Sequence, residues 1–126
     1  MPKTVPQLPG IDSGDLPFSQ LVEAGGLVFV AGQVGSAPGG HEAVPGGIEA
    51  ETRAMLDNVG RVLHAAGLDY GDVVKATVYL VDFADFATMN VVFREYFPTE
   101  PPTRATVGVT KLASDFTIEI EVIASR

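Results

Sequence analysis

Four polar residues near the C-terminus have types and spacing that could support chemistry. Arg104 and Thr106 alternate along one predicted strand, and Glu119 and Glu121 alternate along the next. If residues 111–114 form the loop of a hairpin, Arg104 lies opposite Glu121. Arg104 and Glu119 then become diagonal neighbours, about 7–8 Å apart at Cα. Their shared face lacks the hydrophobic alternation of the two strands, so we expect it to meet solvent, a ligand or another subunit.

This pattern has two interpretations. In the first, Arg104 and Glu121 form a cross-strand ion pair on the surface, worth at most about 1 kcal/mol. Spacing alone favours this interpretation. In the second, Arg104 binds a carboxylate, because a guanidinium presents two parallel donors that match one. Glu119 could then orient or deprotonate a water molecule beside the bound group.

Five strands and two helices are expected to position these residues. The expected elements are strands over 18–22 and 27–34, a helix from about 48 to 66, a strand over 73–81, a helix from about 86 to 97, and a closing hairpin of strands over 104–110 and 116–124. The order ββαβαββ predicts an α+β sandwich, with both helices packed on one face of a sheet.

Two further features of these elements lead to predictions. The strand over 27–34 is apolar nearly throughout, which predicts burial on both faces. Gly32 within it predicts a bulge or a close backbone approach. Residues 1–16 are rich in Pro, Gly and Asp, so we expect a flexible N-terminal arm before a single domain over 17–126.

Composition excludes several kinds of chemistry. The chain has 126 residues, which suits one domain, and 46% of them are hydrophobic. The absence of cysteine excludes disulfides, thiolate catalysis and Cys-ligated metals, and two histidines argue against a His-rich metal site. The net charge of −8 argues against a nucleic-acid partner. Neither a signal peptide nor a transmembrane segment is visible, so a cytoplasmic location and no membrane partner are expected.

Several segments between residues 16 and 125 occur in the order and with the spacing of a known family. They are 17–20 (PFSQ), 28–33 (VFVAGQ), 52–59 (TRAMLDNV), 65–68 (AAGL), 72–80 (DVVKATVYL), 85–90 (DFATMN), 102–107 (PTRATV) and 118–124 (IEIEVIA). On these segments the chain resembles the RidA/YjgF family of reactive-intermediate deaminases, some members of which are labelled endoribonuclease L-PSP or translation inhibitor.

The resemblance implies a chorismate-mutase-like α+β fold. It also implies a homotrimer whose sheets line a central barrel, with three clefts between subunits. The family arginine that holds the substrate carboxylate falls on Arg104, and the family glutamate that orients water falls on Glu119. These two are therefore the expected catalytic residues.

The remaining site residues also come from the resemblance. The family asparagine of the second helix falls on Asn90, and the glycine of the Ala-Gly-Gln turn falls on Gly32. At three further positions of the substrate pocket this chain departs from the family. Phe18 stands where tyrosine is often found, Ala31 where serine is often found, and Thr106 where cysteine is often found.

The resemblance implies an enzyme that hydrolyses 2-imino or enamine acids, of the 2-iminobutanoate and 2-iminopropanoate type, to 2-keto acids and ammonia. That reaction needs no cofactor and no metal. One alternative is a non-catalytic protein that binds small carboxylates such as 2-keto acids. Another is a pathway-specific deaminase of aminoacrylate-like or aminomuconate-like compounds. A ribonuclease is a further possibility, against which the charge of −8 and the lack of a histidine pair argue.

Overall fold

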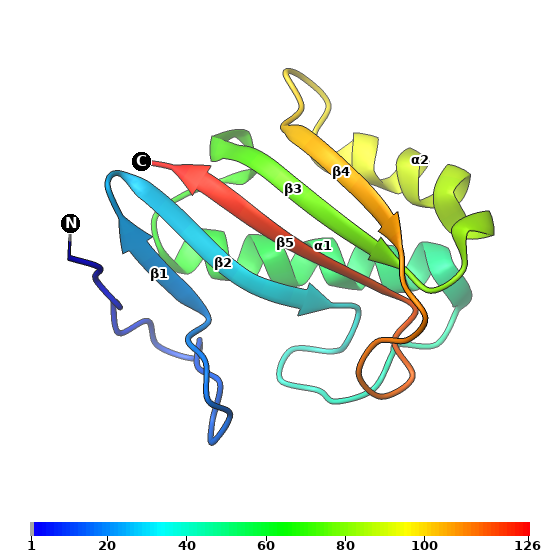
Figure 1. Ribbon diagram of the computed structural model, residues 1–126, viewed down its shortest axis with the longest axis horizontal. Coiled ribbons are helices and arrows are strands. Elements are labelled where there is room, and N and C mark those ends of the chain that lie inside the picture. Colours follow the sequence, from blue (N-terminus) through cyan, green and yellow to red (C-terminus); the bar gives the residue numbers. More distant parts are fainter. Residues whose placement is uncertain (1) are drawn as a thin grey trace.

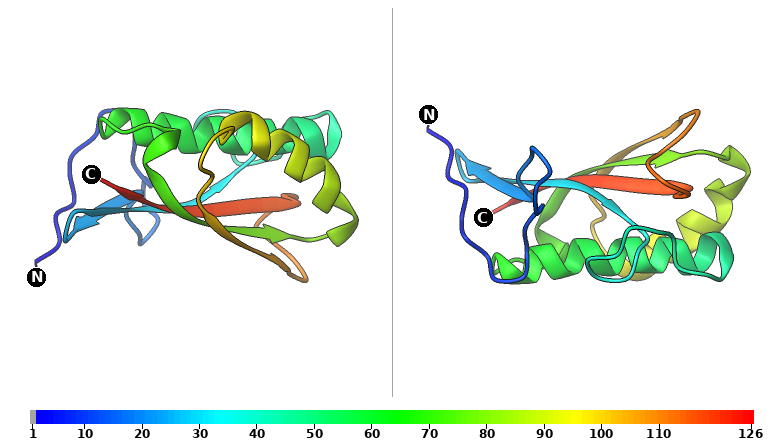
Figure 2. Two further views of the ribbon diagram at one scale, coloured as in Figure 1. Left: turned by 90° about the horizontal axis from the view of Figure 1, so that it is seen from above. Right: turned by 90° about the horizontal axis from the view of Figure 1, so that it is seen from below.

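The computed structural model describes residues 2–126 and has two layers, a five-stranded sheet and two α-helices that cover one of its faces (Figures 1 and 2). This arrangement confirms the predicted α+β fold. The elements are β1 (Leu21–Ala24), β2 (Leu27–Val34), α1 (Gly47–Ala65), η1 (Tyr70–Asp72), β3 (Val73–Leu80), η2 (Phe83–Asp85), α2 (Phe86–Tyr96), β4 (Thr103–Gly108) and β5 (Ile118–Ser125).

The strand order is β1-β2-β5-β3-β4, so the predicted closing hairpin is wrong. Strand β5 lies between β2 and β3 and is antiparallel to both, whereas β4 pairs in parallel with β3. The cause is the connection through α2, which returns the chain to the end where β3 begins and so makes β4 parallel to β3. Strand β5 runs the other way and occupies the remaining side of β3.

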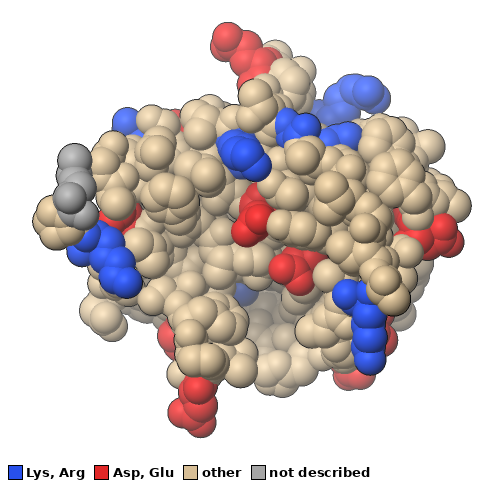
Figure 3. Space-filling model, viewed as in Figure 1, with Lys and Arg blue, Asp and Glu red and all other residues tan. Residues whose placement is uncertain are grey.

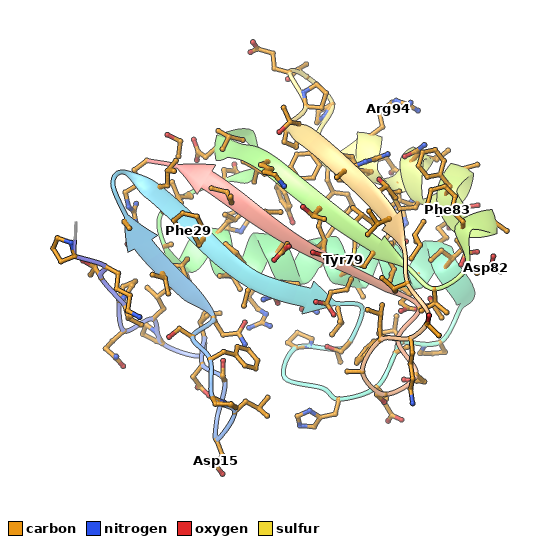
Figure 4. All side chains as sticks on the ribbon, viewed as in Figure 1. Asp15, Phe29, Tyr79, Asp82, Phe83 and Arg94 are labelled. Atoms are coloured by element: carbon orange, nitrogen blue, oxygen red, sulfur yellow. The ribbon has the colours of Figure 1, made fainter. Side chains whose placement is uncertain are left out.

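The helices bury only one face of the sheet. On β2, Val28 and Val30 are buried beneath α1, while Leu27 and Phe29 remain 38% and 40% exposed on the opposite face. The prediction that this strand is buried on both faces is therefore wrong for the single chain. No element of residues 2–126 lies over that side, which we call the open face. Figure 4 shows Phe29 and Tyr79 on it.

Helix α1 forms because its apolar residues recur at helical spacing, and these residues make the core. Its buried apolar side chains are Met55, Leu56, Val59, Val62 and Leu63, as the spacing predicts. The helix ends where Gly67 adopts a positive φ of 78°, a conformation that glycine adopts without strain.

A buried carboxylate ties the start of α1 to the start of β5. Glu51 is 4% exposed and accepts hydrogen bonds from the Thr117 backbone N–H (2.7 Å), the Thr117 hydroxyl (2.6 Å) and the Ile118 backbone N–H (3.3 Å). These bonds satisfy the buried charge, as burial requires. They fix where β5 enters the sheet, one residue before Glu119.

The N-terminal segment runs along the outer edge of the sheet. Thr4 and Glu23 exchange two backbone hydrogen bonds of 2.8 Å, which extends the sheet beyond β1. Leu8 and Ile11 pack against the core. The flexibility of the arm over 1–16 stays a prediction, and its first residue lies outside the described part. None of the helices in residues 2–126 has the length and apolar character needed to span a membrane.

Candidate functional site

Arg104 lies between β4 and α2 in a cradle of four helix side chains. Its guanidinium donates to the Asn90 side-chain oxygen at 2.7 Å and contacts the Met89 sulfur at 3.7 Å. The guanidinium carbon lies 4.8 Å from the centre of the Phe93 ring and 5.7 Å from that of Phe86. Both distances fall within the range of cation–π attraction. The cradle therefore holds the planar cation in one orientation.

The charge of Arg104 has no acidic partner in the described part of the chain. Among the described residues, no carboxylate lies within ion-pair distance of its nitrogens. Burial lowers the pKa of Arg104, because the charged form loses hydration without gaining a counter-ion. A half-buried guanidinium with unused donors attracts an anion, and a carboxylate matches its paired N–H groups.

The face of β4 that carries Arg104 differs from the prediction. Arg104 pairs with Ala76 and Thr106 pairs with Val78, and both partners on β3 are fully buried beneath the helices. Arg104 and Thr106 therefore point toward the helix side, not toward a solvent-facing ladder. Val107 points the other way and is 40% exposed. The long Arg104 stem can line an apolar layer while its charged end reaches the Asn90 amide at the edge.

Glu119 lies on the open face. It pairs with Tyr79 of β3, and its carboxylate presses against the backbone of Gly32, where even a methyl group would collide with it. Burial raises the pKa of Glu119, and the nearby charge of Glu121 raises it further. A carboxylate with a raised pKa is suited to exchanging protons with a bound water.

The Gly32 contact depends on a bulge in β2. The pairing of β2 with β5 shifts between Val30 and Gln33, which confirms the predicted irregularity at Gly32. The buried Gln33 amide donates to the Ala31 carbonyl at 3.2 Å and to the Gln20 side chain at 2.8 Å. The bulge is thus braced from the core side while its Ala31–Gly32 step faces Glu119.

Phe18 precedes β1, which starts at Leu21 rather than at Phe18 as expected. Its side chain is 50% exposed and lines a shallow pocket with the N-terminal segment. Gln20, two residues further on, accepts a backbone hydrogen bond from Ala31. Phe18 therefore lies at the same end of β2 as the bulge.

The predicted site residues form two groups on opposite sides of one sheet. Arg104, Asn90 and Thr106 belong to the helix side, and Glu119 and Gly32 belong to the open face. The expected diagonal contact between Arg104 and Glu119 is wrong, because β3 lies between their strands. The expected cross-strand pair of Arg104 with Glu121 is wrong for the same reason.

Sequence reasoning missed the apolar cradle of Arg104 and one hydrogen bond on the open face. The Arg104 cradle uses Phe86, Met89 and Phe93, which share a helical face with Asn90. The Tyr79 hydroxyl donates to Glu121 at 2.5 Å, which the strand pattern alone cannot show. Over residues 2–126, the His, Asp and Glu side chains form no cluster of three that could hold a metal ion.

The fold and these groups define an α+β protein with an unpaired arginine on the helix side of its sheet and a half-buried glutamate on the open face. The sequence model of the family described as Endoribonuclease L-PSP matches residues 13–126. A RutC family protein of Pyrococcus horikoshii is 47% identical over 110 residues, 87% of each chain. The 2-iminobutanoate/2-iminopropanoate deaminase of Bos taurus is 43% identical over 86% of this chain and 79% of its own.

Solved structures of similar proteins have the same fold as this chain. RidA from an Antarctic Psychrobacter superposes with a TM-score of 0.88 at 32% identity, covering 98% of this chain and 99% of that one. TdcF of E. coli, solved with bound serine, superposes with a TM-score of 0.83 at 38% identity, covering 93% and 94%. The chain belongs to the RidA/YjgF family, also described as endoribonuclease L-PSP, and has its chorismate-mutase-like fold.

Proposed function

We propose that this protein hydrolyses small 2-imino acids, and the enamines in equilibrium with them, to 2-keto acids and ammonia. Water adds to the imine carbon and forms a carbinolamine. The C–N bond then breaks, the carbonyl forms from the added oxygen, and the nitrogen leaves as ammonia carrying both protons of the water. Relatives at 42–43% identity are named for this activity on 2-iminobutanoate and 2-iminopropanoate.

The unpaired Arg104 carries the proposal. Its guanidinium is fixed by Asn90 and by two aromatic rings, yet no carboxylate of the described chain neutralises it. The substrate carboxylate is the group that such a site would take. Holding the substrate in one orientation accounts for a large part of the rate, because the imine already hydrolyses slowly in water.

Glu119 is the group that orients and activates the water. Its carboxylate is half-buried against Gly32, and its raised pKa favours taking a proton from water and returning it to the leaving nitrogen. The reaction as written needs no metal and no cofactor.

We further propose that the site is completed between subunits of a homotrimer. Because Arg104 and Glu119 lie on opposite sides of the sheet, one subunit would supply the arginine and its neighbour the glutamate. The open face, on which Phe29 and Val107 are each 40% exposed, is the surface that neighbouring copies would cover. Light scattering tests the assembly, with three times 13.2 kDa as the expected mass.

Three residues would shape the substrate pocket. Phe18 and Ala31 lie at the Gly32 end of β2, and Thr106 lies one step along β4 from Arg104 on the same face. In the resemblance described above, these positions often carry the hydroxyl or thiol of tyrosine, serine and cysteine. Phe18 and Ala31 lack such a group, so we expect a preference for small apolar side chains on the substrate.

A trapping assay tests the function. An amino-acid dehydratase or oxidase generates the imine, and semicarbazide captures what the protein has not hydrolysed. Wild-type protein should lower the captured fraction, whereas R104A should not. R94A is the matched control, since Arg94 is exposed on the same helix that cradles Arg104 (Figure 4).

Binding without turnover is the second candidate, because Phe18, Ala31 and Thr106 stand where the family often has tyrosine, serine and cysteine. It uses the same Arg104. A 2-keto acid that binds wild type but not R104A, with no change in trapping for any imine, would establish it and exclude the enzyme. Aminoacrylate-like and aminomuconate-like compounds extend the substrate panel. The net charge of −8 leads us to expect no RNA binding.

A further inference from the structure

Glu119 and Glu121 point to the same face of β5 but turn toward different neighbouring strands. Because the two residues are separated by one position, their Cα atoms lie about 7 Å apart along the strand. Glu119 leans toward β2, where its carboxylate contacts Gly32. Glu121 leans toward β3, where it accepts a hydrogen bond of 2.5 Å from the Tyr79 hydroxyl. Figure 3 shows acidic side chains emerging at the middle of this face, with a blue Lys or Arg group near them.

The Tyr79 bond crosses the strand register. Tyr79 is paired at Cα with Glu119, and Thr77 is paired with Glu121. The phenol nevertheless bonds to the diagonal carboxylate and not to the directly opposite one. Tyr79 therefore holds Glu121 over β3 and leaves Glu119 beside the bulge.

The charged and titratable groups on this face are few. Strand β3 contributes Lys75 and Tyr79, and β5 contributes Glu119 and Glu121. The residues that face Glu119 from β2 and β4 are uncharged, and the helices lie on the other side. The Lys75 ammonium donates to the Thr77 hydroxyl at 2.9 Å. In the described chain no lysine or arginine reaches ion-pair distance of Glu121.

We propose that Tyr79 and Glu121 are a positioning pair for Glu119, in which the Tyr79 hydroxyl draws the Glu121 carboxylate toward β3 and leaves Glu119 alone at the Gly32 bulge. Without this bond, Glu121 is free to turn toward Glu119 and compete for the same water. The inference rests on the proposed function for its effect on rate, but the geometry of the pair does not depend on it.

The protonation of the groups supports this arrangement. The bond to Glu121 raises the pKa of Tyr79 to about 12, so the phenol stays a donor at any physiological pH. The Glu121 charge contributes to the raised pKa of Glu119, second to burial. Removing that charge should therefore lower the pKa of Glu119, and releasing it from Tyr79 should raise that pKa.

The first test measures Glu119 itself and needs no substrate. In protein labelled with ¹³C at the glutamate δ-carboxyl, E119Q assigns the Glu119 signal, and its pH titration is followed in wild type, E121Q and Y79F. E121Q should move the midpoint down and Y79F should move it up. Y96F is the matched control, because Tyr96 also bonds to a carboxylate, that of Asp57 at 2.7 Å, but on the helix side. A Glu119 midpoint unchanged in both E121Q and Y79F would overturn the proposal.

The second test measures turnover. In Y79F, kcat should fall about tenfold because the attacking water is misplaced. KM should stay unchanged because Arg104 still holds the substrate carboxylate. The apparent pKa of the acid limb of the kcat/KM profile should follow the Glu119 titration. It should fall in E121Q and rise in Y79F. If wild type turns over and R104A does not, while Y79F and E121Q match wild type, the pair is refuted and the function stands. If wild type is inactive, the function fails and the carboxyl titration still decides the pair.

Discussion

Arg104 and Glu119 lie on opposite faces of one β-sheet, with strand β3 between their strands. Arg104 is paired with Ala76, which is buried under the helices, and Glu119 is paired with Tyr79 on the open face. Strand β3 and the thickness of the sheet separate the two side chains within one chain. A reaction that needs both therefore requires two copies of the chain, and this requirement can be tested directly.

The sharpest test is complementation between two inactive variants. R104A and E119Q should each lack activity alone. Co-expressed in equal amounts, they should regain activity, because some clefts then combine an intact Arg104 from one subunit with an intact Glu119 from another. Random assembly of a cyclic trimer predicts roughly a quarter of the wild-type rate. Separately purified variants assayed together without subunit exchange serve as the control, and no recovery on co-expression would refute the shared site.

Substituting Arg104 by lysine separates charge from geometry. R104K keeps the positive charge but loses the planar pair of donors and the fit between Phe86 and Phe93. We expect kcat/KM to fall at least about tenfold, mainly through a higher KM. Steady-state kinetics across a range of imine concentrations will measure this. A KM equal to that of wild type would mean that the substrate carboxylate binds elsewhere.

G32A should impair catalysis while sparing the fold. A methyl group at Gly32 collides with the end of the Glu119 side chain, which can swing away, and the backbone of Gly32 does not need a positive φ. The carboxylate would leave its place, so we expect kcat to fall about a hundredfold with little change in thermal stability. G71A is the control, since a methyl group there meets no atom within 4 Å. Equal kcat in both variants would contradict the role of this contact.

Activity should depend on pH through Glu119. The water-activating form is the carboxylate, so kcat/KM falls as the pH is lowered through the pKa of Glu119. Burial places that pKa above the ordinary glutamate value of 4.5. The pH profile of the wild type should show this limb, and that of E119Q should lose it. A limb that persists in E119Q would assign the titration to another group.

Glu51 should matter for stability. Its buried carboxylate accepts three hydrogen bonds at the start of β5, and E51A would leave the Thr117 and Ile118 N–H groups without acceptors. We expect a loss of about 2–4 kcal/mol in the free energy of unfolding, measured by urea denaturation at one fixed chain concentration. E49A is a suitable comparison, because Glu49 lies in the same helical turn and forms no such bonds to β5. Equal midpoints for the two variants would argue against the anchoring role.

Much of the molecule could be predicted from local patterns. Helical spacing located α1 and α2, and runs of apolar and β-branched residues located β2 and β3 to within a residue. Gly32 inside a strand pointed to the bulge that the structure contains. These features depend on neighbours in the chain, so the amino-acid order carries them.

Local patterns could not predict which strands pair in the sheet. Alternation along 104–110 and 116–124 suited a hairpin, but alternation describes the faces of a strand and not its neighbours. The crossover through α2 makes β4 parallel to β3. Strand β5 pairs with the other edge of β3 and also with β2. This one difference moved Arg104 to the helix side.

The sequence by itself therefore determined the fold class, the family and the residue types of the site, because helical and strand periodicity and motif spacing are properties of the chain. Only the tertiary structure decided where those residues lie. It brought the Arg104 guanidinium into contact with α2, the Glu119 carboxylate into contact with Gly32, and the Tyr79 hydroxyl into contact with Glu121. Those contacts join segments distant in the chain, and they depend on which strands pair and which face the helices cover.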